Sequence, residues 1–313
     1  MLPPLMLTGE ILSLTVAVMW TFTAIFAEMA SRRMGALPLN VWRMAVTIAA
    51  IMMLLWCTAG SPWPQYADGR VWAWMLASGF MGFVFGDYCL FGSYLLIGSR
   101  FGQLFMTLAG PFAALSSWLV LGESMSWVAL LGMVVTVAGI SISICARDEA
   151  GHRRVRLPVK GILLGLGAGM GQGVGLVLSK AGIQCYESLL PPDAAATQAM
   201  LPFAATMMRA LMGLLGFGLM LLWQGRTRQL ASAWASRRTA LPALGAILLG
   251  PLFGVSLSLH AVHLTSAGVA QTLMSLTPVF ILWPSHVFFG TPVKMREVAG
   301  ATIAIAGASL FFL

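Results

Sequence analysis

Ten apolar stretches, each about 20 residues long, account for most of this 313-residue chain. The hydrocarbon core of a bilayer is about 30 Å thick, and a helix needs about 20 residues to cross it. We therefore expect an all-α fold with ten transmembrane helices. The expected spans are residues 9–28, 39–57, 71–97, 101–121, 127–146, 161–182, 201–223, 240–262, 267–289 and 298–313.

The composition also favours a membrane protein. Hydrophobic residues make up 59% of the chain and charged residues 9%, whereas a soluble domain carries about 25% charged residues. A chain with so few charged side chains cannot cover its surface in water. We therefore expect a polytopic membrane protein, which crosses the bilayer many times.

The basic residues gather on one side of the expected spans. Short loops rich in Lys and Arg stay in the cytoplasm. Of the 18 basic residues, only Arg70, Lys180 and Arg209 fall outside the connections and helix ends of that side. The net charge of +8 therefore indicates topology and not nucleic-acid binding. We expect the protein in the cell's inner (cytoplasmic) membrane, with both termini outside.

The second half of the chain repeats features of the first half in the same order. The matching features are PFAAL at 111–115 with PVFIL at 278–282, Gly122 with Gly290, Gly132 and Gly139 with Gly300 and Gly307, and Arg43 with Arg209. Two repeats that each cross the membrane five times must lie upside down relative to each other, as in many secondary transporters. We expect a first five-helix repeat at residues 1–148, a basic cytoplasmic linker at 149–160 and a second repeat at 161–313.

Residues 111–139, PFAALSSWLVLGESMSWVALLGMVVTVAG, resemble the EamA-type signature of the drug/metabolite transporter (DMT) superfamily. Gly86-Asp87 followed by Leu90-Phe91 resembles a sub-group of that superfamily. The second repeat departs from the signature, because Gly290-Thr291-Pro292 stands where Gly122-Glu123 stands in the first. The resemblance covers essentially the whole chain as two EamA repeats. It implies a ten-helix carrier of small organic solutes, often an exporter.

Helices interrupted by glycine at matching positions of the two halves indicate a transport site. The third expected span has Gly86 before Asp87, and the eighth has Gly250-Pro251 and Gly254. We pair Asp87 with Gly254 and expect the solute site between these two helices, beside the first, fourth, sixth and ninth. The sixth span carries glycines in two four-residue series, which are typical of close helix packing. It can also form a thin cavity wall.

Five residues are candidate substrate ligands: Trp20, Asp87, Gln172, Arg209 and His260. A carboxylate inside a span is costly, about 2.5–3.5 kcal/mol on insertion scales. Asp87 therefore binds a cationic or amino group, takes up a proton during transport, or fixes the fold by capping a helix or pairing with an arginine. Arg209 is expected to meet a carboxylate of the substrate or of the protein. We expect Trp20 in the cavity wall, Gln172 as the polar group of the sixth helix and His260 as a polar or titrating cavity residue.

Other polar residues favour structural roles. Glu28 and Arg32 have the i,i+4 spacing of a helical ion pair, and Arg43, near a helix start, is expected to reach the lipid headgroups. His260 and His263 lie one turn apart, but no cysteine or carboxylate close in sequence completes a metal site. The sequence contains no zinc-protease, serine-hydrolase or Walker A motif.

The sequence therefore predicts a secondary transporter, with export favoured, for small organic metabolites, amino-acid-like compounds or drugs. Alternating access is the expected mechanism, with proton coupling through Asp87 or with none. We expect no enzymatic activity and no cofactor. The alternatives are a metal-ion carrier and a non-transporting membrane enzyme or partner subunit. The expected partners are a small-molecule substrate and the lipid bilayer, with no nucleic acid; a homodimer is left open.

Overall fold

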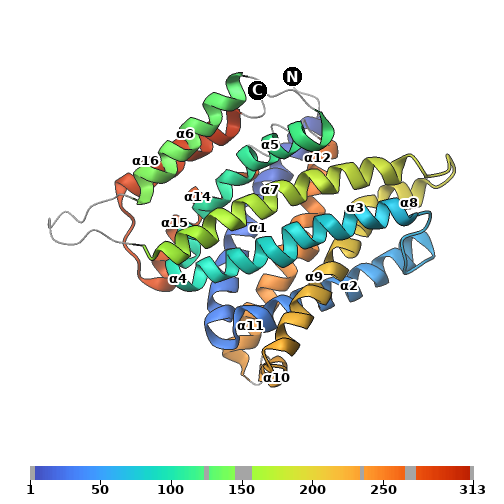
Figure 1. Ribbon diagram of the computed structural model, residues 1–313, viewed down its shortest axis with the longest axis horizontal. Helices are drawn as coiled ribbons and strands as arrows, with labels where there is room; N and C mark the ends of the chain where they lie inside the picture. Colours follow the sequence, from blue (N-terminus) through green and yellow to red (C-terminus); the bar gives the residue numbers. More distant parts are fainter. Residues whose placement is uncertain (1–3, 123–126, 145–156, 233–235, 265–272, 311–313) are drawn as a thin grey trace.

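The computed structural model describes residues 4–122, 127–144, 157–232, 236–264 and 273–310. In these ranges every regular element is helical (Figure 1), as the sequence predicted. Parts of what the sequence predicted lie outside the described residues: the start of the expected ninth span, the ends of the expected fifth and tenth spans, Glu123 of the EamA-type signature, and residues 149–156 of the linker.

Six helical stretches are long and apolar enough to cross a membrane, judged by length and composition. They are Thr8–Met34, Ala36–Ala59, Gly69–Val120, Val159–Glu187, Leu201–Trp223 and Arg237–Ser258. Two shorter apolar helices, Leu131–Ser143 and Thr277–Phe289, lie in the regions of the expected fifth and ninth spans. The stretch Gly69–Val120, with 52 residues, contains both the third and the fourth expected span.

The elements follow one another in corresponding order in the two halves. Those of the first half are α1 (Pro4–Met34), α2 (Ala36–Ala59), α3 (Gly69–Gly79), η1 (Phe80–Asp87), α4 (Tyr88–Phe105), η2 (Met106–Leu108), α5 (Ala109–Leu121) and α6 (Trp127–Ile144). Those of the second half are α7 (Val159–Glu187), α8 (Ala195–Ala199), α9 (Leu201–Trp223), α10 (Arg228–Ser232), α11 (Arg237–Ile247), η3 (Leu248–Val255), α12 (Ser256–Leu264), α14 (Thr277–Phe280), α15 (Leu282–Phe289) and α16 (Met295–Ser309).

The third and fourth expected spans are separated by a kink in the backbone. Gly98, inside α4, has φ 80° and ψ 158°, a conformation that glycine adopts without steric penalty. The chain therefore changes direction at this residue. The backbone N–H of Ser99 donates a 2.5 Å hydrogen bond to Oε2 of Glu28, so a carboxylate of α1 caps the helix that restarts here. Glu28 also forms the predicted ion pair with Arg32, at 2.8 Å.

The two halves are interleaved. The first helix of each half packs mainly against the other half: α1 against α11, η3 and α12, and α7 against α3, η1 and α4. The corresponding helices α2 and α9 pack on each other, as do α6 and α16. In Figure 1, α16 lies along α6, and α1 begins at the same end of the bundle at which α16 ends.

Glycines allow α7 to approach its neighbours closely, as predicted for the sixth span. On one face, Gly165 and Gly169 lie against Phe105. On the other face, Gly171 lies against Gly86, and a Cβ atom at Gly171 would be 2.7 Å from the Gly86 Cα atom. Such small residues let backbones touch where lipid provides no hydrophobic drive for association. The close-packing prediction is confirmed.

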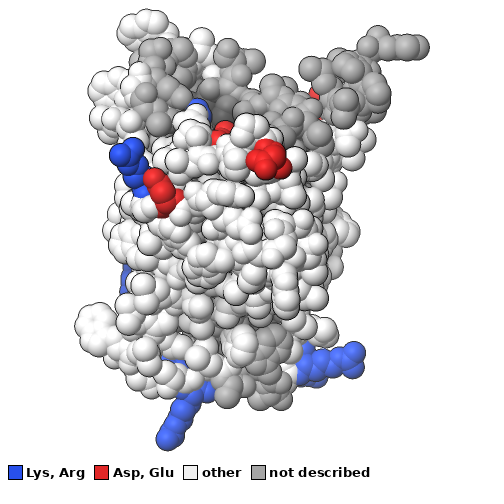
Figure 2. Space-filling view, turned by 90° about the vertical axis from the view of Figure 1, so that its right-hand side faces the viewer, with Lys and Arg blue, Asp and Glu red and all other residues white. Residues whose placement is uncertain are grey.

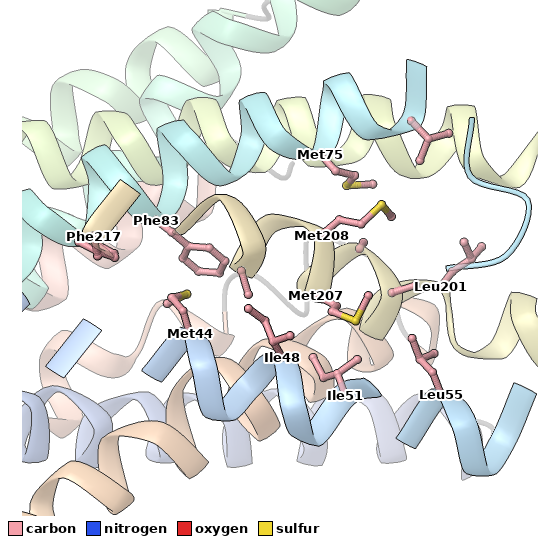
Figure 3. Close-up of a cluster of buried hydrophobic side chains, with 14 of the residues drawn as sticks. Met44, Ile48, Ile51, Leu55, Met75, Phe83, Leu201, Met207, Met208 and Phe217 are labelled. Atoms are coloured by element: carbon pink, nitrogen blue, oxygen red, sulfur yellow. The ribbon is translucent and has the colours of Figure 1, made fainter. Parts of the chain in front are cut away.

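The largest buried apolar cluster lies between α2 and α9, with α3 and η1 beside them. Figure 3 shows side chains of α2 facing those of α9, with Met75 of α3 and Phe83 of η1 on the other side of α9. The labelled members are Met44, Ile48, Ile51, Leu55, Met75, Phe83, Leu201, Met207, Met208 and Phe217. Two arginines, Arg43 and Arg209, directly adjoin members of this cluster in sequence and are also buried.

The outer surface has the charge distribution of a membrane protein. Figure 2 shows one face on which charged side chains gather toward the two ends, with a broad, mostly uncharged zone between them. Large apolar side chains such as Leu119, Val134 and Leu219 are exposed. An apolar belt of this kind suits contact with lipid. The fold is that of an integral, multi-pass membrane protein.

Candidate substrate site at the two π-helical segments

Within the described residues, each half of the chain contains one π-helical segment of eight residues. These are η1, with the sequence FMGFVFGD, and η3, with LLGPLFGV. π-helical turns are rare and often occur at functional sites. In η3, Gly250 has non-helical dihedral angles (φ −85°, ψ −105°), and the following residue, Pro251, lacks the N–H that would continue the helix. The sequence analysis found these glycines but did not predict the π-helical geometry.

The two π-helical segments define the register of the repeat. Their lengths and glycines coincide when Gly82 is aligned with Gly250 and Gly86 with Gly254. Asp87 then corresponds to Val255. The predicted pairing of Asp87 with Gly254 was wrong by one residue.

Asp87 ends η1 and lies inside the protein, with 4% of its surface exposed. Nη1 of Arg43 donates a hydrogen bond to Oδ2 of Asp87 at 2.9 Å. Nε2 of Gln172 donates to Oδ1 of Asp87 and to the carbonyl oxygen of Gly82, both at 3.0 Å. These contacts join α2, η1 and α7, and therefore both halves of the chain.

Arg43 does not reach the headgroups, so that prediction was wrong. It is 5% exposed, and besides Asp87 it contacts two more first-half residues. Its Nη1 donates to Oδ1 of Asn40 at 2.5 Å, and its guanidinium lies 4.6 Å from the centre of the Phe91 ring. A buried charge is tolerated when it is paired and hydrogen-bonded. Neither Asn40 nor Arg43 was predicted as a site residue, although the two residues lie three positions apart on the same helix.

Arg209 is the second buried arginine, with 8% exposure. Its guanidinium lies 4.9 Å from the centre of the Phe83 ring. A Cβ atom at Gly82 would be 2.8 Å from its Nη2, so the glycine makes room for this group. Asp87 attracts Arg209 electrostatically. We call Arg43, Asp87, Gln172 and Arg209 the polar cluster.

Each arginine reaches toward the π-helical segment of the other half. Arg209, from the second half, lies beside Gly82 of η1. Arg43, from the first half, lies beside Gly250 of η3, where a Cβ atom would be 3.5 Å from its Nη2. The repeat that the sequence indicated for Arg43 and Arg209 thus reappears as a crossed arrangement of two guanidinium groups.

Trp20 and Gln172 have equivalent positions in the two halves. Gln172 of α7 lies against Gly86 of η1, and Trp20 of α1 lies against Gly254 of η3. Trp20 is partly buried and packs with apolar residues that include Val16 and Ala261. Three of the five candidate ligands therefore belong to the polar cluster, and Trp20 lies at the other π-helical segment.

The fifth candidate, His260, lies apart from these residues. It is exposed on α12. His263 belongs to the same helix, and His286 of α15 contacts the carbonyl oxygen of Thr291 at 2.9 Å. Among the described residues, no group of three or more His, Cys, Asp or Glu side chains could hold a metal ion.

The chain was compared with known protein families and structures. A model of the EamA-like transporter family matches it twice, over residues 7–145 and 159–313. A solved crystal structure shares its fold, with a TM-score of 0.62 and 15% sequence identity over 97% of this chain and 96% of the other. No curated protein matches the chain in sequence.

Proposed function

Because this chain belongs to the EamA-like transporter family of the DMT superfamily, we propose that it is a secondary carrier of small organic solutes that works by alternating access. The observation that supports this most directly is the polar cluster, which is buried between the two halves. Charged groups within membrane helices are costly and usually serve a solute path or a specific partner. The polar cluster is therefore the proposed substrate site.

The composition of the polar cluster suits movement between the halves. Arg43 and Asp87 come from the first repeat, and Gln172 and Arg209 come from the second. In the proposed cycle, ten helices cross the membrane, and one five-helix repeat rocks against its inverted twin. That movement would open the cluster, in which both arginines and Asp87 are now less than 9% exposed. The π-helical segments supply backbone that can rearrange near the site.

The proposed cargo follows from the family and the size of the polar groups. It is a small metabolite, an amino-acid-like compound or a drug, and export is the proposed direction. The proposed location is the cytoplasmic membrane, with both termini outside, because the basic connections favour the cytoplasm.

Asp87 is also the proposed proton site. Its protonation would remove the negative charge that holds Arg43. It would also change how the first half contacts the second, since Gln172 binds the same carboxylate. Proton binding and reorganisation of the cluster would in this way be linked.

Transport by purified protein in liposomes tests the proposal. Cells that overexpress the protein are first grown with toxic amino acids, carboxylic acids and amines, and compounds that change growth are then used as labelled solutes. We expect counterflow of at least one solute and its loss in Asp87→Asn. Asp193→Asn, which changes an exposed loop carboxylate, should transport normally. If no solute moves faster than in protein-free liposomes, the proposal is wrong.

Proton coupling has its own test in the same liposomes. Transport by the wild type should respond to an imposed pH gradient, and the response should disappear when Asp87 is replaced. If the flux does not respond to the pH gradient, proton coupling is ruled out and facilitated diffusion remains.

A further inference from the structure

Among the described residues, the polar cluster contains two buried arginines but a single carboxylate, that of Asp87. In the first half, Arg43 forms an ion pair with Asp87 at 2.9 Å. In the second half, the residue that corresponds to Asp87 is Val255, the last residue of η3. Arg209 therefore lacks the carboxylate that its repeat-related counterpart has.

Arg209 finds no substitute partner within the described part of the chain. No carboxylate of the described residues lies within ion-pair distance of it, and its Nε atom has no hydrogen-bond partner there. Its nearest electrostatic partner, Asp87, is already engaged by Arg43 and Gln172. A buried guanidinium without a counter-charge is costly in the membrane, and this cost suggests a ligand.

A second buried polar group, Ser256, lies on a helix that packs against the helix carrying Arg209. α12, which begins at Ser256, packs against α9, which carries Arg209. Ser256 is 1% exposed, and its hydroxyl group has no hydrogen-bond partner among the described residues. Val255 is only partly buried. An unpaired cation and an unpaired hydroxyl group thus lie on neighbouring helices: Arg209 lies beside η1, and Ser256 directly follows η3, which has no acidic residue.

We infer that the transported solute carries a carboxylate group, which binds Arg209 and takes the part that Asp87 plays for Arg43. This inference rests on the proposed transport function. The charges support a monoanionic group, because two arginines and one aspartate leave one positive charge in the polar cluster. A planar guanidinium also binds a carboxylate through two parallel hydrogen bonds.

Stability measurements test this inference without knowledge of the solute. Arg43→Gln should lower the unfolding temperature in detergent, because it leaves the buried Asp87 without its ion-pair partner. Arg209→Gln should leave it unchanged or raise it, because it removes an unpaired buried cation. Arg226→Gln, which changes an exposed arginine, is the control. If Arg209→Gln destabilises the protein as much as Arg43→Gln, Arg209 is a structural residue and the inference is wrong.

A carboxylate supplied by the chain should replace that of the solute. Val255→Asp should be tolerated better when Arg209 is present than in the Arg209→Gln background, and Val255→Asn should show no such dependence. If the effects of Val255→Asp and Arg209→Gln on unfolding are additive, the two positions do not interact, and the inference is overturned.

Transport assays then separate this inference from the proposed function. Liposomes are supplied with labelled probes that share the isobutyl group of leucine: leucine, isocaproate, leucinamide and isoamylamine, together with compounds from the growth screen. Solutes with a carboxylate should be carried, and Arg209→Gln should reduce their flux about tenfold or more, with partial recovery in Arg209→Lys. Flux confined to amines or neutral compounds overturns the inference and leaves the carrier function standing. Absence of all flux refutes both.

Discussion

Replacing Asp87 with asparagine removes one negative charge and preserves the shape of the side chain. The ion pair between Arg43 and Asp87 is almost fully enclosed, because the exposed fractions of the two side chains are 6% and 5%. Breaking a buried pair by removing one partner typically lowers the free energy of unfolding by about 3–5 kcal/mol. Asparagine keeps an oxygen that can accept from Arg43 or Gln172, so we expect a loss near about 3 kcal/mol.

The double variant Arg43→Gln/Asp87→Asn isolates the charge contribution. The double variant no longer contains an unpaired Arg43, so its loss of unfolding free energy should be smaller than the sum of the two single losses. The expected coupling is about 1–3 kcal/mol. The assay is unfolding by SDS titration in mixed detergent micelles, with Asp193→Asn as the exposed, charge-matched control. The reasoning is refuted if Asp87→Asn stays within about 0.5 kcal/mol of the wild type, or if the two losses are additive.

Three further predictions concern packing, capping and orientation. A Cβ atom at Gly139 would lie 2.7 Å from the Cα atom of Ala304, so Gly139→Ala should push α6 from α16 and lower stability by about 1–3 kcal/mol. A Cβ atom at Gly218 would meet nothing within 4 Å, so Gly218→Ala should be neutral or raise the free energy of unfolding by up to about 1 kcal/mol. Equal losses of stability in Gly139→Ala and Gly218→Ala would contradict the packing argument. Glu28→Gln weakens both an ion pair and a helix cap and should lower the free energy of unfolding by about 1–3 kcal/mol. Replacing its half-exposed partner Arg32 with Gln should lower it by about 0–1 kcal/mol. If Arg32→Gln costs more than Glu28→Gln in the same titration, the capping argument is rejected. Epitope tags at both termini should react with a membrane-impermeant label on intact spheroplasts, and labelling only after permeabilisation would reverse the predicted orientation.

Local sequence patterns predicted the packing of the helices well. The two glycine series of the sixth span needed only the spacing of residues on one helix, and both faces are closely packed, one against Phe105 and the other against Gly86. The i,i+4 ion pair of Glu28 and Arg32 also joins residues of one helix, so their spacing alone predicted it. The hydrogen bond from the Ser99 N–H to Glu28 was not predictable, because it joins residues 71 positions apart.

The site was less predictable because its contacts are distant in sequence. Arg43 lies near a helix start and therefore resembles an interfacial residue, but Asp87, 44 positions away, draws it inside. The pairing of an arginine with Asp87 had been one of the open alternatives, yet nothing local identified which arginine. The π-helical segments were not predicted, because glycine and proline indicate an interrupted helix without specifying its hydrogen bonds.

The exchange of first helices between the halves has a consequence for how the protein is made. During synthesis α1 enters the bilayer long before α11, η3 and α12, which form most of its helical surroundings. The first repeat alone would thus contain a helix with few of its final neighbours, and α3, η1 and α4 would lack their packing against α7. We therefore expect that neither half folds by itself and that assembly is complete only after most of the second repeat has been inserted.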